Sequence, residues 1–232
     1  MPTPSQLKYI DYDTAREHIR DADVLLFRGR ALISRAIKIG TRSDYSHVGL
    51  AGWSNGSEWA RLSCYEMVWS GGQGVSLRHY AETIPGQVDV YHVQDMHVEM
   101  VWDHIRKELV GTPKTLNRRM AVALMQDFCR PGTYGKWHLV YNMVTRLPVL
   151  RIFFRPPNDD QFEDGSRMPV CSEAGSNVLK RSFTDVVRQT SDMHTSPGDL
   201  ARSPLLHYKF TLDTPKISVE EKELQCALAA QV

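Results

Sequence analysis

The chain has 232 residues, which is long enough for a sizeable core, and we expect a single domain over residues 1–232. Its hydrophobic content of 42% and charged content of 24% are ordinary for a soluble globular protein. The formal net charge of +1 gives no electrostatic signal for binding nucleic acid, so we predict no nucleic-acid partner.

The N-terminal stretch "MPTPSQLKYIDYD" has no basic segment followed by an apolar one, so no secretory signal is predicted. Nowhere does the sequence approach the roughly 18 consecutive apolar residues that a membrane span needs. We therefore predict no transmembrane segment, and we expect the protein to be cytoplasmic as it is made.

The first part of the chain alternates between helical and strand patterns. A short helix is predicted over 12–22, and a buried strand over 23–29 precedes a second helix over 31–40, which Gly40 closes. Three further strands, separated by loops rich in Gly and Ser, are predicted over 46–53, 62–69 and 87–93. Their succession predicts an antiparallel meander.

The second part of the chain favours helices. Helical patterns such as "VEMVWDHIRKELV" and "LNRRMAVALMQDFC" predict a helical insertion over about 97–150, and the polar stretch 155–167 predicts an exposed loop. A helix over 171–183 and a strand over 205–212 follow, with a polar helix at the C-terminal end. The predicted fold class is α+β, a small antiparallel sheet packed against helices.

His47 lies in the predicted strand "SHVGLAGW". Side chains alternate along a strand, so His47 shares a face with Gly49 and Ala51, while Val48 and Leu50 point to the other face. Small neighbours leave room for a substrate to reach the imidazole. A histidine that only packs in the sheet is the alternative, and one histidine does not decide between them.

Glu66 lies in the next predicted strand, "LSCYEMVW", on the same face as Leu62 and Cys64. A buried carboxylate is costly unless it is paired. Paired strands lie about 4.8 Å apart, so a histidine on the adjacent strand is within reach as its partner. The alternative is a glutamate on an edge strand that faces water.

Cys171 begins the predicted helix "CSEAGSNVLKRSF". A thiolate at a helix N-terminus is favoured by the helix dipole and by free N–H groups, which makes the thiol nucleophilic. The same N–H groups can hold an oxyanion. The alternative is a buried cysteine that starts an amphipathic helix. The other cysteines, Cys64, Cys129 and Cys226, lie in no comparable setting.

Neither a disulfide framework nor a metal site is predicted. The four cysteines are widely scattered and include no CxxC pair. The histidines of "HVQDMH" and "HVEMVWDH" are five and seven residues apart, whereas zinc-binding helices place two histidines four apart. We predict no metal and no other cofactor.

Together, three segments resemble the circularly permuted branch of the NlpC-type papain-like superfamily. They are "DVLLFRGRALISRAIKIGTRSDYSHVGL", "YEMVWSGGQGVSLRHYAE", and "VCSEAGSNVLKRSF" followed by "SPGDLARS". The resemblance covers roughly 23–93 and 168–203. In that branch the strand with the histidine precedes the helix with the cysteine.

The resemblance implies a papain-like fold and a thiol hydrolase. Cys171 matches the nucleophile, His47 the general base, and Glu66 the polar residue that orients the imidazole. The backbone N–H groups of Cys171 and Ser172 match the oxyanion site, and Tyr45 is a candidate wall of the pocket. The implied reaction is hydrolysis of an amide or ester through an acyl-enzyme.

The resemblance further implies a peptidoglycan stem-peptide amide as the substrate class. Lipid or N-acyl amides, with hydrolase or acyltransferase chemistry, are the alternative. Without a predicted signal, a wall substrate requires unusual delivery, such as packaging in a phage particle or use on imported muropeptides. A different class of function is also open, in which a virion or other complex component keeps the hydrolase fold only for binding.

Overall fold

The computed structural model describes residues 8–29, 32–54, 61–68, 70–83, 87–129, 171–187 and 195–213. The elements of the first half are β1 (Tyr9–Ile10), α1 (Tyr12–Arg16), β2 (Val24–Phe27), α2 (Leu32–Thr41), β3 (His47–Ser54), β4 (Arg61–Val68), β5 (Gly71–Ser76), α3 (Leu77–Thr83) and β6 (Val88–Val93). Those of the second half are β7 (Met96–Asp103), β8 (Glu108–Thr115), α4 (Arg118–Phe128), α6 (Cys171–Arg181), α7 (Pro197–Arg202) and β9 (Leu206–Leu212).

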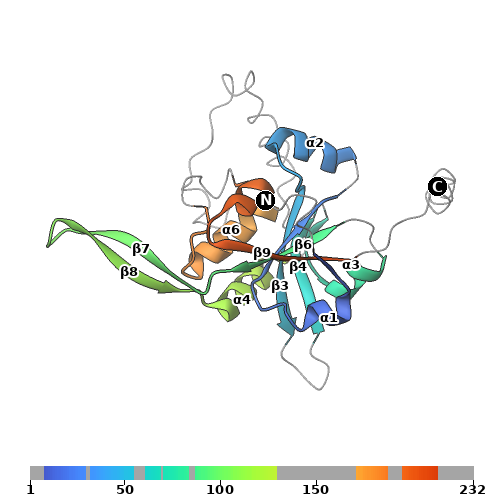
Figure 1. The fold of residues 1–232 in the computed structure, drawn as a ribbon, viewed down its shortest axis with the longest axis horizontal. Helices are drawn as coiled ribbons and strands as arrows, with labels where there is room; N and C mark the ends of the chain where they lie inside the picture. The colour runs from blue at the N-terminus through green and yellow to red at the C-terminus, as the bar shows by residue number, and fades with distance from the viewer. Residues whose placement is uncertain are drawn as a thin grey trace.

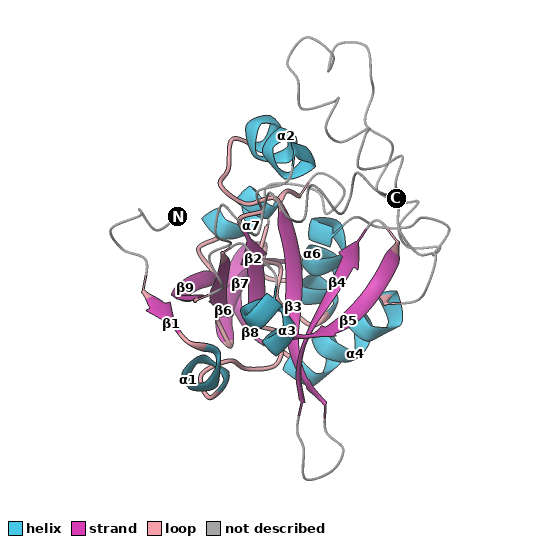
Figure 2. Ribbon diagram, turned by 90° about the vertical axis from the view of Figure 1, so that its right-hand side faces the viewer, coloured by secondary structure: helices cyan, strands magenta, loops and turns pink. Residues whose placement is uncertain are grey.

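Seven strands form one sheet in the order β1-β9-β6-β2-β3-β4-β5 (Figures 1 and 2). Neighbouring strands are antiparallel except for β1 and β9, which are parallel. Helices cover this sheet, so the predicted α+β class and the small, mostly antiparallel sheet packed against helices are confirmed. Within the described ranges, no helix is both long and apolar enough to span a bilayer.

Helices cover both faces of the sheet, and β2 shows this most clearly because all four of its residues are buried. Val24 and Leu26 pack in a core cluster with residues of α4, α6 and α7. Leu25 and Phe27 point the other way, into a second cluster with residues of α1 and α3. A strand that is covered on both faces becomes a continuous apolar run, as "VLLF" is.

The predicted strands 46–53 and 62–69 pair as β3 and β4, but the predicted meander is wrong for the strand after them. β4 pairs next with β5, and β6 lies between β2 and β9. The stretch "SGGQG" was expected to be a loop because of its glycines. Gly72 is required in β5 because a Cβ there would lie 2.4 Å from the Phe128 carbonyl oxygen, where α4 ends against the sheet.

The helix predicted at the start of the 97–150 insertion is also wrong. Residues 96–115 form β7 and β8, a hairpin that is a sheet of its own and extends away from the rest of the fold (Figure 1). The apolar residues Met96, Val98, Met100 and Trp102 recur every second position, the period of a strand. The helical pattern that follows is confirmed as α4, whereas residues 130–150 and the predicted loop 155–167 lie outside the described residues.

Candidate active site

His47 and Glu66 project from the same face of neighbouring strands. The register pairs Gly49 with Glu66, so His47 is the diagonal neighbour of Glu66 across the ladder. The imidazole Nε2 lies 2.7 Å from the Glu66 Oε2, and the His47 side chain keeps 23% of its surface exposed. The two residues therefore form a hydrogen-bonded pair at the point where β3 begins.

Two residues that were not predicted complete the environment of the Glu66 carboxylate. Gln73 of β5 donates its side-chain N–H to Oε1 at 2.7 Å, and the Tyr80 hydroxyl of α3 donates to the same oxygen. Burial alone would raise the pKa of Glu66, but its hydrogen bonds and the charge of His47 lower it. Glu66 therefore remains a carboxylate, although only 1% of its side chain is exposed.

Cys171 is the first residue of α6 and is buried in the same core cluster as Val48 of β3. Its side chain lies close enough to the imidazole to raise the pKa of His47. Glu66 occupies Nε2, which leaves Nδ1 as the imidazole nitrogen for Cys171. The structure thus brings together side chains from β3, β4 and α6.

The pKa of His47 is raised to about 10. Burial lowers it, but the charge of Cys171 and its hydrogen bond raise it, and the hydrogen bond and charge of Glu66 raise it further. The imidazole therefore carries a proton at neutral pH, next to the sulfur of Cys171. A positive charge beside a thiol favours the thiolate.

Phe27 fixes the position of the imidazole from the neighbouring strand. It is the register partner of His47, and its ring centroid lies 5.2 Å from that of the imidazole. The Phe27 ring also contacts Tyr80 at 5.1 Å, edge to face. The ring that orients His47 and the hydroxyl that holds Glu66 therefore belong to one packed unit.

The small residues beside His47 do not leave the open space that the sequence suggested. A Cβ at Gly49 would lie 2.4 Å from the sulfur of Cys64, so the neighbouring strand fills that space. Ala51 is buried in the core cluster beneath α1 and α3. The glycine is required by packing, so the sheet face beside His47 is filled at Gly49.

Ser172 and Tyr45 were predicted around the oxyanion and the pocket. The Ser172 hydroxyl donates to the Thr195 carbonyl oxygen at 2.7 Å, which ties the start of α6 to the segment before α7. Tyr45 is fully buried, and its hydroxyl donates to Asp89 at 2.5 Å. Its ring shares a core cluster with Cys171, while its hydroxyl belongs to a separate polar network with Arg28 and Asp89.

The two other described cysteines are in settings that keep them neutral. Cys64 is fully buried, and burial raises its pKa well above the ordinary value. Burial also raises the pKa of Cys129 to about 11. Both are free thiols, and among the described residues no group of three or more His, Cys, Asp or Glu side chains is arranged to hold a metal ion.

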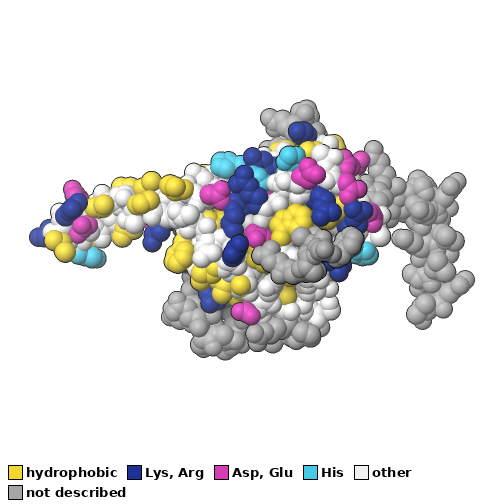
Figure 3. Space-filling view, turned by 90° about the horizontal axis from the view of Figure 1, so that it is seen from below, with side chains coloured by type: hydrophobic (Ala, Val, Ile, Leu, Met, Phe, Trp, Pro, Cys, Tyr) yellow, Lys and Arg dark blue, Asp and Glu magenta, His cyan; other side chains and the backbone are white. Residues whose placement is uncertain are grey.

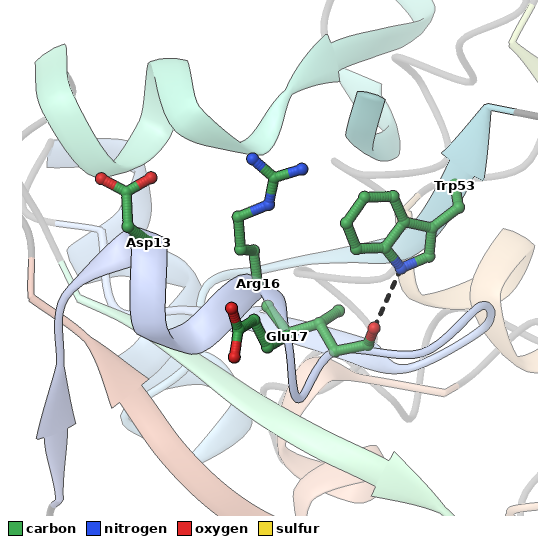
Figure 4. Close-up of a pocket in the computed structure, with 5 residues that line it drawn as sticks. Asp13, Arg16, Glu17 and Trp53 are labelled. Atoms are coloured by element: carbon green, nitrogen blue, oxygen red, sulfur yellow. Dashed lines mark hydrogen bonds between the residues drawn. The ribbon is translucent and has the colours of Figure 1, made fainter. Parts of the chain in front are cut away.

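A surface pocket of about 630 Å³ lies at the other end of β3 (Figure 4). Its lining residues are Asp13, Arg16, Glu17, Ile19 and Trp53. The Trp53 indole N–H donates to the Ile19 carbonyl oxygen at 3.0 Å, and the Arg16 guanidinium lies over the indole ring. Because His47 begins β3 and Trp53 lies near its end, this pocket is separate from the candidate active site.

No known family model matches the chain, and no curated protein does either. Among solved structures, the chain is similar to the crystal structure of the metalloprotein yiiX from Escherichia coli O157:H7, with 14% sequence identity and a TM-score of 0.49. The similarity covers 82% of this chain and 96% of that chain. At this identity and TM-score, it gives no information on activity or on a bound metal.

Proposed function

We propose that the protein is a cysteine hydrolase of the permuted papain-like type that cleaves an amide or ester bond. The observation that carries the proposal is the position of His47, which is bonded to a buried carboxylate and interacts with the thiol at the start of a helix. A nucleophile, a base and a group that orients the base are the parts of a hydrolytic triad. Here they come from three elements that are far apart in sequence.

The chemistry begins from the ion pair of the Cys171 thiolate and the His47 imidazolium, which forms when the thiol proton moves to Nδ1 before the substrate is attacked. The thiolate attacks the carbonyl carbon of the substrate, and the negative charge moves to the carbonyl oxygen. The first N–H groups of α6, at Cys171 and Ser172, have no acceptor within the helix and stabilise that charge. Glu66 holds the imidazole in position during the transfer.

The tetrahedral intermediate collapses when His47 donates its proton to the leaving amine or alcohol. The acyl group is then a thioester on Cys171. His47 next takes a proton from water, and the resulting hydroxide attacks the thioester carbonyl. Release of the carboxylic acid restores Cys171 and His47 for another cycle.

The family resemblance favours a peptidoglycan stem-peptide amide as the substrate, with lipid or N-acyl amides as the second class. The decisive experiment measures hydrolysis of muropeptides, N-acyl amides and acyl esters by the wild type and by Cys171→Ser. Wild type should cleave one class, and Cys171→Ser should lose about a thousandfold or more of that activity.

Cys129→Ser is the matched control. Cys129 is a second free thiol at the end of α4, and its sulfur donates to the Gln73 carbonyl oxygen of β5. Its activity should stay within about twofold of wild type, as expected for a substitution outside the reacting groups. Hydrolysis that survives in Cys171→Ser, or an intact protein that cleaves no member of the panel, would contradict the proposal. The second result would favour a binding protein that keeps the hydrolase fold.

A further inference from the structure

The hairpin of β7 and β8, residues 96–115, forms an arm. It is a two-stranded sheet that is hydrogen-bonded to no strand of the main sheet (Figure 1). An isolated two-stranded hairpin is only marginally stable in water. A partner surface that covers the arm would therefore stabilise it.

One side of the arm is apolar along its whole length. The register places the side chains of four pairs on this side: Met96 with Thr115, Val98 with Pro113, Met100 with Gly111, and Trp102 with Leu109. The large side chains among them are between 49% and 61% exposed, and Ile105 in the turn is 94% exposed. Apolar side chains are visible along the arm in Figure 3. No charged residue interrupts this side.

The turn at the free end of the arm carries two cationic side chains between two carboxylates. His104, Ile105, Arg106 and Lys107 are all exposed, and Asp103 and Glu108 flank them. The Arg106 Nε lies 3.7 Å from the Asp103 Oδ2, but the Arg106 side chain keeps 67% of its surface exposed. The end of the arm therefore presents the apolar Ile105 beside two exposed cationic side chains, and a complementary site would be an apolar hollow with a carboxylate beside it.

Such a hollow lies at the base of the arm. A cleft of about 530 Å³ is lined by apolar residues, namely Val98, Val186, Val187, Pro204 and Leu205, and by the polar or charged residues His97, Asp185, Asp199, Arg202 and Ser203. Val98 belongs both to this cleft and to the apolar side of the arm, so the two surfaces are continuous. Arg202 pairs with Asp199 at 2.7 Å, so Asp185 gives the cleft its net negative charge.

These surfaces are complementary to each other, but they lie at opposite ends of one arm. An eight-residue strand is about 27 Å long, so the turn of an arm is too far from its own cleft. In a second copy placed antiparallel to the first, the turn of each arm reaches the cleft of the other. This is the geometry of a two-fold symmetric interface, in which each contact occurs twice.

The exposed apolar area is sufficient for this arrangement. Large apolar side chains that are about half exposed offer roughly 100 Å² each, so the five on this side and Ile105 of the turn together offer about 600 Å² per copy. Adding the cleft brings each copy close to the roughly 800 Å² that a stable interface buries on each partner. We propose that the protein forms a dimer in which the two arms lie antiparallel and Ile105 of each copy occupies the cleft at the base of the other arm.

The first test is the mass in solution, measured by sedimentation over a range of concentrations. Wild type should be a dimer of the 26.5 kDa chain, and Ile105→Asp should raise the dimer dissociation constant at least tenfold, since it places a charge in an apolar cleft. Ile39→Asp is the matched control, because Ile39 is also highly exposed but lies in α2. It should dissociate like wild type.

The second test addresses the position of the arm. Arg106→Glu should weaken the dimer, and adding Asp185→Arg should restore it, because the two substitutions exchange the charges across the interface. Mixing Ile105→Cys with Val187→Cys under mild oxidation should give a covalent dimer, whereas Ile39→Cys mixed with Val187→Cys should not. Cys171→Ala should dimerise like wild type, so this inference stands apart from the proposed hydrolysis.

Three results would overturn the proposal. The wild type could be monomeric at every concentration, the dimer could be indifferent to Ile105→Asp, or Asp185→Arg could fail to restore Arg106→Glu. A monomer that co-sediments with phosphatidylcholine vesicles through the arm would assign the apolar side to a lipid surface instead.

Discussion

Glu66 is a buried carboxylate that three donors from three different elements hold in place: His47, Gln73 and Tyr80. The cost of burying an unpaired carboxylate was enough to suggest His47 as the partner of Glu66, because the two strands were predicted to be neighbours. Gln73 and Tyr80 were missed because the first lies in a glycine-rich stretch and the second in a helix of seven residues. The helical spacing of the apolar residues Leu77, Tyr80 and Ala81 was the available signal for that helix, and these residues are the buried ones.

The pH dependence of stability follows from His47. Its pKa rises from an ordinary 6.5 to about 10 on folding, so it stabilises the fold fully below pH 6.5, and this contribution is lost as the pH rises through 10. The difference in the free energy of unfolding between wild type and His47→Gln should therefore shrink from pH 6.5 to pH 10. Urea denaturation at several pH values measures it.

Glu66 changes the stability of the fold with pH in the opposite direction, and it does so below the pH range in which His47 acts. Its lowered pKa stabilises the fold above pH 4.5 and loses that effect as the pH falls further. It is ionised in both the folded and the unfolded state above pH 6.5, so it does not disturb the comparison. A difference between wild type and His47→Gln that stays constant up to pH 10 would show that folding does not raise the pKa of His47.

At the scale of elements, the strands and helices around the site were predictable, but the arm and β5 were not. Residues 98–110 contain an alternation of apolar and polar residues that competes with a helical spacing, and the sequence alone did not decide between them. Lys107 adopts a left-handed backbone conformation in the turn, which ends any helix there. Pro113 is tolerated in β8 because this strand has only one neighbour.

Packing between β3 and β4 makes a prediction for Gly49. Gly49→Ala should destabilise the protein by about 1–3 kcal/mol, because the added methyl group overlaps the sulfur of Cys64. Adding Cys64→Ala removes the sulfur and should recover about 1 kcal/mol or more relative to the sum of the single substitutions. Chemical denaturation of the four proteins in this double-mutant cycle measures the coupling.

Additive effects of the two substitutions would contradict this account of Gly49. They would indicate open space above the glycine, which is what a substrate path across the sheet face requires. A matched comparison is Gly175→Ala, where a Cβ would make only ordinary contact with Val48 and Leu50 at 3.4–3.6 Å. Gly175→Ala should lower the free energy of unfolding much less than Gly49→Ala does.

At the scale of the whole molecule, the order of the main sheet was beyond the sequence because it depends on pairing between distant strands. β6 lies between β2 and β9, which are separated by most of the chain, and local patterns do not contain such pairings. The α+β class was predictable, because it depends only on whether the helical and the strand spacing of apolar residues both occur along the chain. Among the described elements, β7 and β8 of the arm lie outside the main sheet.

The fold should therefore survive loss of the arm. Replacing residues 99–112 by Asn-Gly joins the paired positions Val98 and Pro113 with a tight turn. The free energy of unfolding should change by less than about 1 kcal/mol, since the removed residues are mostly exposed, and the shortened protein should be monomeric. A collapse of the fold would show that the arm is part of the core.

The most direct test of the catalytic account is the rate at which iodoacetamide alkylates Cys171 at pH 6, located by mass spectrometry. Cys171 should react much faster than Cys129, whose raised pKa of about 11 keeps it a thiol. His47→Gln should slow alkylation of Cys171 about tenfold or more, because the positive charge that favours the thiolate is lost. Equal rates at Cys171 and Cys129, unchanged in His47→Gln, would contradict the assignment of Cys171 and His47 as a catalytic pair.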